Sequence, residues 1–126
     1  MSQTLPGSLQ STVSLPALFA PTADASKRFI EFFTANIRNP NTRKAYAWAV
    51  GEFAAWCEAN GFTELSDIEP VHVAAYIEIL WQRLSTPSVK QHLAAIRMLF
   101  DWLVVGQTLV TNPASSVRGP KHSVRK

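Results

Sequence analysis

Several residue types and patterns are scarce in this 126-residue sequence, and each absence excludes a class of protein. The single cysteine, Cys57, excludes an internal disulfide and a cysteine-based metal cluster. No apolar run approaches the ~20 residues of a transmembrane helix, and the N-terminus lacks the basic and apolar blocks of a secretory signal. The histidines His72, His92 and His122 do not have the spacing of a zinc site. We therefore expect a cytoplasmic protein that binds no membrane, metal or cofactor.

A β-strand alternation long enough to build a sheet is also missing, whereas helical periodicity is clear. The strongest pattern covers residues 86–106. Thr86 is a suitable N-cap, Pro87 suits the first helical position, and Gly106 suits the C-terminal stop. We predict a long helix here, with one apolar face that packs on a core. That face consists of Val89, Leu93, Ile96, Phe100 and Leu103, which step by four, three, four and three residues.

Three further helices are predicted before this one. The first covers residues 25–37 with Asp24 as its cap, the second covers 42–60 and ends at Gly61, and the third covers 71–84. Each has an apolar stripe at helical spacing, and the stripes are rich in Phe, Trp and Tyr.

Four helices without strands predict an all-α fold, a four-helix bundle. Hydrophobic residues make up 47% of the chain, which is enough for a core. We place the helical domain at residues 23–112. The uncharged Ser-, Thr- and Pro-containing segment 1–22 is expected to be a flexible arm, and residues 113–126 are expected to be a basic linker.

Charge is distributed unevenly along the chain. Residues 45–82 contain six acidic residues and no Lys or Arg, a net charge of −6. The rest of the chain has 12 basic and three acidic residues, a net charge of +9, although the total is only +3. One basic and one acidic region are typical of a protein with a nucleic-acid-binding face and a solvent face.

The basic residues gather at two predicted helix starts and in the tail. Arg43 and Lys44 have the wrong sign for the positive end of a helix dipole. An external anion would explain them, and the alternative is that both are ordinary solvated side chains. Hydroxyl groups and backbone N–H groups at helix starts bind phosphates, while Lys and Gln in a major groove suit guanine and adenine. The candidate DNA ligands are Asn41, Thr42, Arg43 and Lys44 in the second helix, Thr86, Ser88, Lys90, Gln91 and Arg97 in the fourth, and Arg118, Lys121 and Arg125 in the tail.

No residues are arranged for catalysis. Tyr46 and Tyr76 both fall on apolar stripes, where they are predicted to be core residues. His122 and Arg125 have His-x-x-Arg spacing, but they lie in the basic tail with no tyrosine beyond them. We expect the chain alone to be without catalytic activity.

With these helices in place, the chain resembles the N-terminal core-binding domain of Cre/Xer-like tyrosine recombinases, the phage integrase family. Three stretches carry the resemblance, and their order and spacing are more specific than any one of them. They are residues 41–46 with Phe53 and Trp56; residues 65–70 with Val73, Tyr76 and Leu80; and residues 88–93 with Ile96, Phe100, Trp102 and Asn112-Pro113, followed by the exit at 119–121.

The resemblance implies a SAM-like helical domain that forms half of a clamp on double-stranded DNA, with its second and fourth helices facing the duplex. The catalytic half would follow in the parent enzyme, other recombinase protomers would join the full assembly, and this fragment would be monomeric. An alternative is a helical protein-interaction module of the SAM or death-domain kind, which would use Trp48 or Trp81 and the acidic region. The charge split favours DNA, because such a module has no need of basic helix starts.

Overall fold

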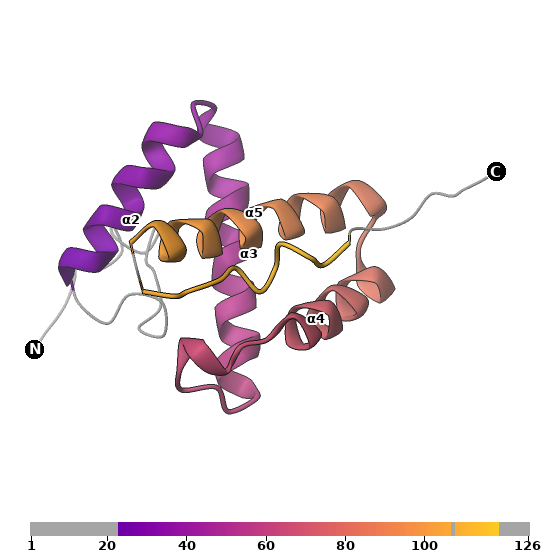
Figure 1. Cartoon of the computed structure of the whole chain (residues 1–126). Coiled ribbons are helices and arrows are strands. Elements are labelled where there is room, and N and C mark those ends of the chain that lie inside the picture. Colours follow the sequence, from indigo (N-terminus) through magenta and orange to yellow (C-terminus); the bar gives the residue numbers. More distant parts are fainter. Residues whose placement is uncertain (1–22, 107, 119–126) are drawn as a thin grey trace, which may run out of the picture.

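The computed structural model describes residues 23–106 and 108–118, and that part of the chain is all-α, as predicted. It contains four α-helices and one 3-10 helix, and no strand occurs within it (Figure 1). The elements are α2 (Ala23–Asn36), α3 (Pro40–Ala59), η2 (Leu65–Asp67), α4 (Pro70–Arg83) and α5 (Thr86–Val105). The predicted arm at 1–22 and the tail beyond Arg118 lie outside the described residues.

Helix α5 lies at the centre of the fold. In Figure 1, α5 crosses α3, α4 lies below it, and α2 lies near its C-terminal half. Its buried residues extend from Val89 near its start to Leu103 near its end. Phe29 of α2 also packs edge-to-face on Trp102 of α5, with ring centroids 5.0 Å apart. The helices therefore cross around α5 instead of running as an aligned bundle.

The starts of α3 and α5 differ from their predicted positions by one or two residues. Helix α3 begins at Pro40, because the Asn39 side chain is the cap and accepts hydrogen bonds from the N–H groups of Asn41 (2.8 Å) and Thr42 (3.4 Å). The cap of α5 is Ser85, so Thr86 is already helical and Pro87 is its second residue. Proline is tolerated there because N–H groups in a first turn have no helical partner.

The predicted cap of the first helix is also wrong. Asp24 lies inside the first turn of α2, where its acidic side chain suits the helix dipole and pairs with Arg28 at 3.6 Å. The predicted end of α3 is confirmed: Asn60 is the C-cap, and Gly61 follows with a φ of +85°, a conformation that favours glycine.

Aromatic side chains form the middle of the core. Phe53 of α3 has no exposed surface, and its ring lies 5.9 Å from that of Phe100, 5.1 Å from Tyr76 and 6.2 Å from Trp56. These contacts join α3, α4 and α5 at one point. All five predicted apolar residues of α5 are buried.

The core also includes a segment beyond residue 112, where the predicted domain ended. Ala114 and Val117 are buried, and the Arg97 guanidinium of α5 donates hydrogen bonds to both of their carbonyl groups. The Asn112 side chain donates to the Arg97 carbonyl (3.1 Å) and to an Asp101 carboxylate oxygen (2.7 Å). The packed domain therefore extends to Val117. The sequence pattern missed this because two apolar residues in a turn have no helical period.

A polar cluster lies where α3, α4 and α5 meet. Burial lowers the pKa of His92 on α5; the Glu52 carboxylate of α3 opposes this shift, and Arg83 of α4 adds to it. Within the described part of the chain, the buried His92 Nδ1 has no hydrogen-bond partner. The folded state therefore favours the neutral imidazole.

We predict that Phe53→Ala and Phe100→Ala each lower the free energy of unfolding by about 3–5 kcal/mol, because each leaves a cavity at the junction of the helices. Urea unfolding monitored by circular dichroism measures the loss. The exposed Gln82→Ala on α4 is the control and should change stability by less than about 0.5 kcal/mol. Wild-type stability in either Phe variant would show that this aromatic cluster is not the core.

We also predict that His92 weakens the fold in mild acid. Its pKa is below about 6.5 in the folded state and returns to about 6.5 on unfolding, so the unfolded state binds more protons below that pH. The free energy of unfolding should fall as the pH drops below 6.5, and His92→Gln should remove part of this fall. Urea unfolding at pH 7.5 and 5.5 measures it. An equal pH dependence in wild type and variant would contradict the prediction.

Candidate nucleic-acid interface

The first turn of α3 presents a cationic surface. It contains no acidic residue; Asn41 and Lys44 are exposed, while Thr42 and Arg43 are half-buried. Arg43 Nη2 donates a hydrogen bond to the Arg38 carbonyl at 3.2 Å, and within the described residues the buried Arg43 Nε has no partner. The backbone of the preceding turn thus holds the Arg43 guanidinium, and Lys44 extends into solvent.

The start of α5 has the same character. Its first turn also lacks an acidic residue; Lys90 and Gln91 are exposed, and Thr86 is half-buried. Ser88 is half-buried, and its Oγ accepts a hydrogen bond of 3.1 Å from the Ser85 hydroxyl group. Burial of the neighbouring Val89 and Leu93 turns Lys90 and Gln91 outward.

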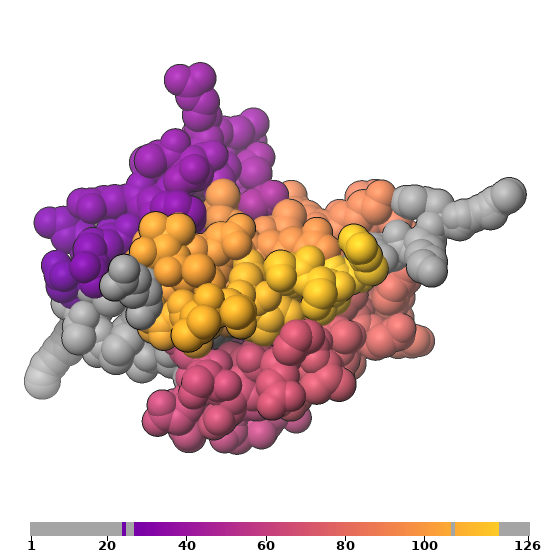
Figure 2. Space-filling view, viewed as in Figure 1, coloured from indigo at the N-terminus to yellow at the C-terminus, as the bar shows by residue number. Residues whose placement is uncertain are grey.

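The two helix starts do not form one compact pocket. Figure 1 shows the start of α3 at the top of the molecule and the start of α5 at the right, with the crossing of the two helices between them. The space-filling view in Figure 2 shows the same separation across the surface. A small anion cannot contact both, whereas an extended polyanion can.

The remaining candidate ligands have different surroundings. The guanidinium of Arg97 is engaged with the carbonyl groups of Ala114 and Val117, so it is used inside the protein. Arg118 is exposed and lies beside α4. Lys121 and Arg125 lie outside the described residues.

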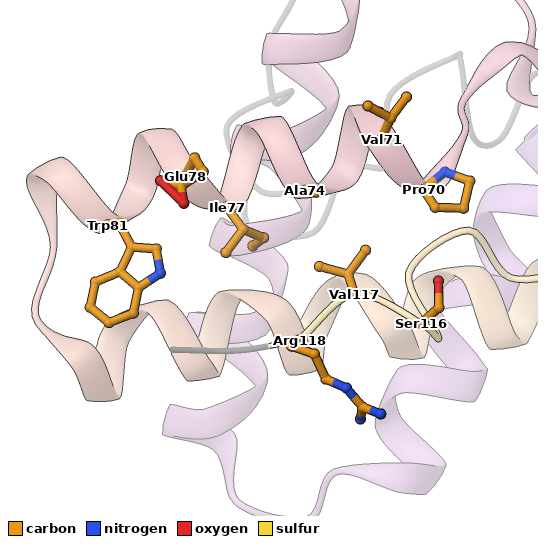
Figure 3. Close-up of a pocket in the computed structure, with 9 residues that line it drawn as sticks. All are labelled: Pro70, Val71, Ala74, Ile77, Glu78, Trp81, Ser116, Val117 and Arg118. Carbon is orange, nitrogen blue, oxygen red and sulfur yellow. The ribbon is translucent and has the colours of Figure 1, made fainter. Parts of the chain in front are cut away.

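A groove of about 400 Å³ separates α4 from the segment that ends at Arg118 (Figure 3). Val71, Ala74, Ile77, Trp81 and Val117 supply its apolar surface, and its only charged lining residues are Glu78 and Arg118. One acid and one base of this kind do not form a catalytic arrangement. The groove is instead the described surface that a protein-interaction module would use, and it includes Trp81.

Among the titratable groups that resemble nucleophiles, Cys57 and Tyr76 are buried and Tyr46 is half-buried. Burial raises the pKa of the Cys57 thiol to about 12, with a smaller contribution from Glu58. Burial likewise raises the pKa of Tyr76, and Tyr46 is half-buried against the Phe33 ring. Residues 23–106 and 108–118 contain no group of three side chains able to hold a metal ion. Every helix in this part is too short or too polar to cross a bilayer.

Helix α3 also carries an exposed tryptophan, Trp48, which is not among the predicted DNA ligands. Trp48, which the sequence suggested only for protein interaction, lies one turn beyond Lys44 and is 67% exposed. Gly51 lies three residues further along the same helix. A glycine in a helix interior is unusual, and this is the sequence signal that could have drawn attention to this face of α3.

Comparison with known proteins agrees with this geometry. Residues 26–108, which contain most of α2 and all of α3, α4 and α5, match the family model described as phage integrase, N-terminal SAM-like domain. No curated protein and no solved structure gives a significant match. Since the family model covers well over half of the 126 residues, the chain belongs to the phage integrase N-terminal SAM-like domain family.

Proposed function

We propose that this chain is the DNA-binding, core-binding domain of a site-specific tyrosine recombinase or integrase. It would clamp one side of the recombination site, while a catalytic domain elsewhere in the parent enzyme cleaves and rejoins the strands. One observation carries the proposal: α3 and α5 each have an exposed lysine as their fifth residue and no acidic residue in the first turn. Membership of the integrase family supports it.

Electrostatics explains why these two starts suit a duplex. Each helix N-terminus carries a partial positive charge and N–H groups without helical partners, and Lys44 or Lys90 adds a full charge there. Such a site attracts an anion from outside the protein. Two sites at separate places on the surface are matched by the repeated phosphates of double-stranded DNA.

Four exposed acidic residues lie away from the start of α3. Glu58 is near the C-terminal end of α3, Glu64 and Asp67 are beside or within η2, and Glu78 is on α4; all four are exposed. These elements occupy the lower part of Figure 1, away from the start of α3. Repulsion between these acids and phosphates would orient the domain with α3 and α5 toward the duplex.

The proposed contacts are the exposed residues of each start. Lys44 with Asn41, and Lys90 with Gln91, would reach phosphates or base edges, and Thr42, Arg43, Thr86 and Ser88 would support them. Arg97 is left out because its guanidinium is engaged inside the protein. Arg118, Lys121 and Arg125 would add non-specific attraction, and other recombinase protomers would join on the assembled site.

The groove beside α4 favours a second candidate function, a protein-interaction module without DNA binding. Its apolar walls and the half-buried Trp81 suit an apolar side chain of a partner. This function does not account for Lys44 and Lys90 at two helix starts. Binding to DNA therefore distinguishes the two candidates.

We predict weak binding of duplex DNA by the isolated chain, with a dissociation constant of about 10⁻⁴–10⁻⁶ M at physiological salt. Lys44→Ala and Lys90→Ala should each weaken binding and reduce the slope of log K against log salt by about 0.9, because each removes one phosphate contact. Fluorescence anisotropy with a labelled duplex at several salt concentrations measures both effects.

Glu58→Ala and Glu78→Ala are the controls for these titrations. Both change the net charge by one unit at exposed sites outside the proposed interface, so the slope should stay at its wild-type value. Wild-type slopes in both lysine variants would remove Lys44 and Lys90 from the interface. Absence of DNA binding at low salt would favour the interaction module.

We also predict that the chain alone does not cleave DNA, because Tyr76 is buried and Tyr46 packs on Phe33. Incubation with supercoiled DNA and with a nicked duplex should yield no relaxed product and no covalent protein–DNA species on a denaturing gel. An adduct mapped by mass spectrometry to either tyrosine would refute this.

A further inference from the structure

The outer face of α3 carries an exposed aromatic ring that the fold does not use. Trp48 is 67% exposed, and among the described residues no other Phe, Tyr or Trp side chain is as exposed. Phe53, on the inner side of the same helix, is fully buried. A tryptophan left in water forfeits the hydrophobic stabilisation that its large ring brings when covered. Its place on this face leaves the ring available for a contact outside the chain.

Gly51 lies one turn from Trp48 and is also unexplained by the fold. A Cβ atom added at Gly51 would have no atom within 4 Å beyond its own helix backbone and chain neighbours. Its φ is not positive, since the only positive-φ glycine described is Gly61. Glycine in a helix interior is less stable than alanine. Neither packing nor backbone conformation thus requires glycine here, whereas the close approach of another molecule would.

These two residues share a face with the cationic start of α3. At 100° per residue, Asn41, Lys44, Trp48, Gly51 and Ala55 fall within an arc of about 80° on the helix surface. The side chains in this arc are a cation, an amide, an indole and minimal side chains, with Ala59 at its edge. The half-buried Glu52, one turn after Trp48, borders the arc about 20° outside it. Glu58, one turn further on, ends the face with a negative charge. The composition changes from cationic to apolar to acidic along about 20 Å of helix.

We propose that Trp48 and Gly51 belong to the DNA interface and extend it along α3 beyond Lys44. In this arrangement the indole packs against deoxyribose or a thymine methyl group, an apolar contact available in the groove of a duplex. Gly51 lets the backbone of α3 approach a strand that a longer side chain would hold away. The inference rests on the proposed DNA-binding function and assigns it a specific non-electrostatic contact.

The position of the face favours DNA over a protein partner. Lys44 is one turn from Trp48, the Arg43 guanidinium is held in the same first turn, and Arg38 lies just before the helix. A partner at Trp48 therefore meets several positive charges at one end of its contact and one half-buried acid, Glu52, one turn beyond the ring. The described groove that would suit an apolar protein segment is the one beside α4, which contains Glu78.

The test compares affinity, salt dependence and stability in the 126-residue chain, with a labelled random-sequence 30-base-pair duplex as the probe. Trp48→Ala should weaken binding about tenfold and leave the slope of log K against log salt unchanged, because no cation is removed. Trp48→Phe should restore part of the affinity. Val71→Ala, which truncates another exposed apolar side chain on α4, is the matched control and should bind like wild type.

Gly51→Gln separates the interface from the fold. Glutamine favours helix more than glycine and has open space at this position, so the variant should melt at or above the wild-type temperature. Its affinity for the duplex should nevertheless fall about tenfold. Ala75→Gln, which adds similar bulk to the exposed face of α4, should leave affinity unchanged.

Each outcome decides a different point. If the wild-type chain does not bind the duplex, the proposed function fails and this inference fails with it. If binding depends on Lys44 but Trp48→Ala and Gly51→Gln bind like wild type, DNA binding stands and the inference is overturned. If Trp48→Ala instead abolishes a self-association seen by sedimentation, with DNA affinity unchanged, the face binds protein and the inference is likewise overturned.

Discussion

The packing of α5 against α3 is the interaction on which the rest of the structure depends. Phe53 and Phe100 meet at the crossing of the two helices, and Tyr76 brings α4 to the same point. Burial of apolar surface is non-directional, but helical periodicity gives it a direction because only one side of each helix is apolar. Once Val89 and Leu93 are buried, Lys90 lies beside the buried face of α5 and Gln91 lies away from it, so both are exposed. The stability of the core and the exposure of the proposed DNA ligands thus have one physical cause.

Helix α3 shows how one rigid element can serve both purposes. Its inner side is buried through Val50, Phe53 and Cys57, and its outer side presents Lys44 and Trp48. A helix whose backbone is already fixed by core packing loses little further backbone entropy when its side chains meet a ligand. A duplex contact built on α3 would therefore need no rearrangement of the backbone, even where single contacts are weak.

Hydrogen bonds complete the fold where apolar packing ends. Arg97 and Asn112 join α5 to the returning segment, whose Ala114 and Val117 then cover the core beside α4. The same contacts form one wall of the α4 groove and place Arg118 at its edge. The last described residue is thus held in a definite position relative to α4 and α5, on the route to the basic tail.

The sequence by itself determined the all-α class, the four helices and most core positions, because apolar periodicity and stop signals such as Gly61 act within a few residues. Helix starts shifted by one or two residues because Asn39, Ser85 and Thr86 are all acceptable near a cap, and local chemistry does not choose among them. Only the tertiary structure distinguished Arg97 from Lys90. The two are similar cations on one helix, but Arg97 meets carbonyl groups 17 and 20 residues away, and Lys90 is exposed. Which cations meet the fold's own carbonyl groups depends on such long-range contacts, which no local pattern encodes.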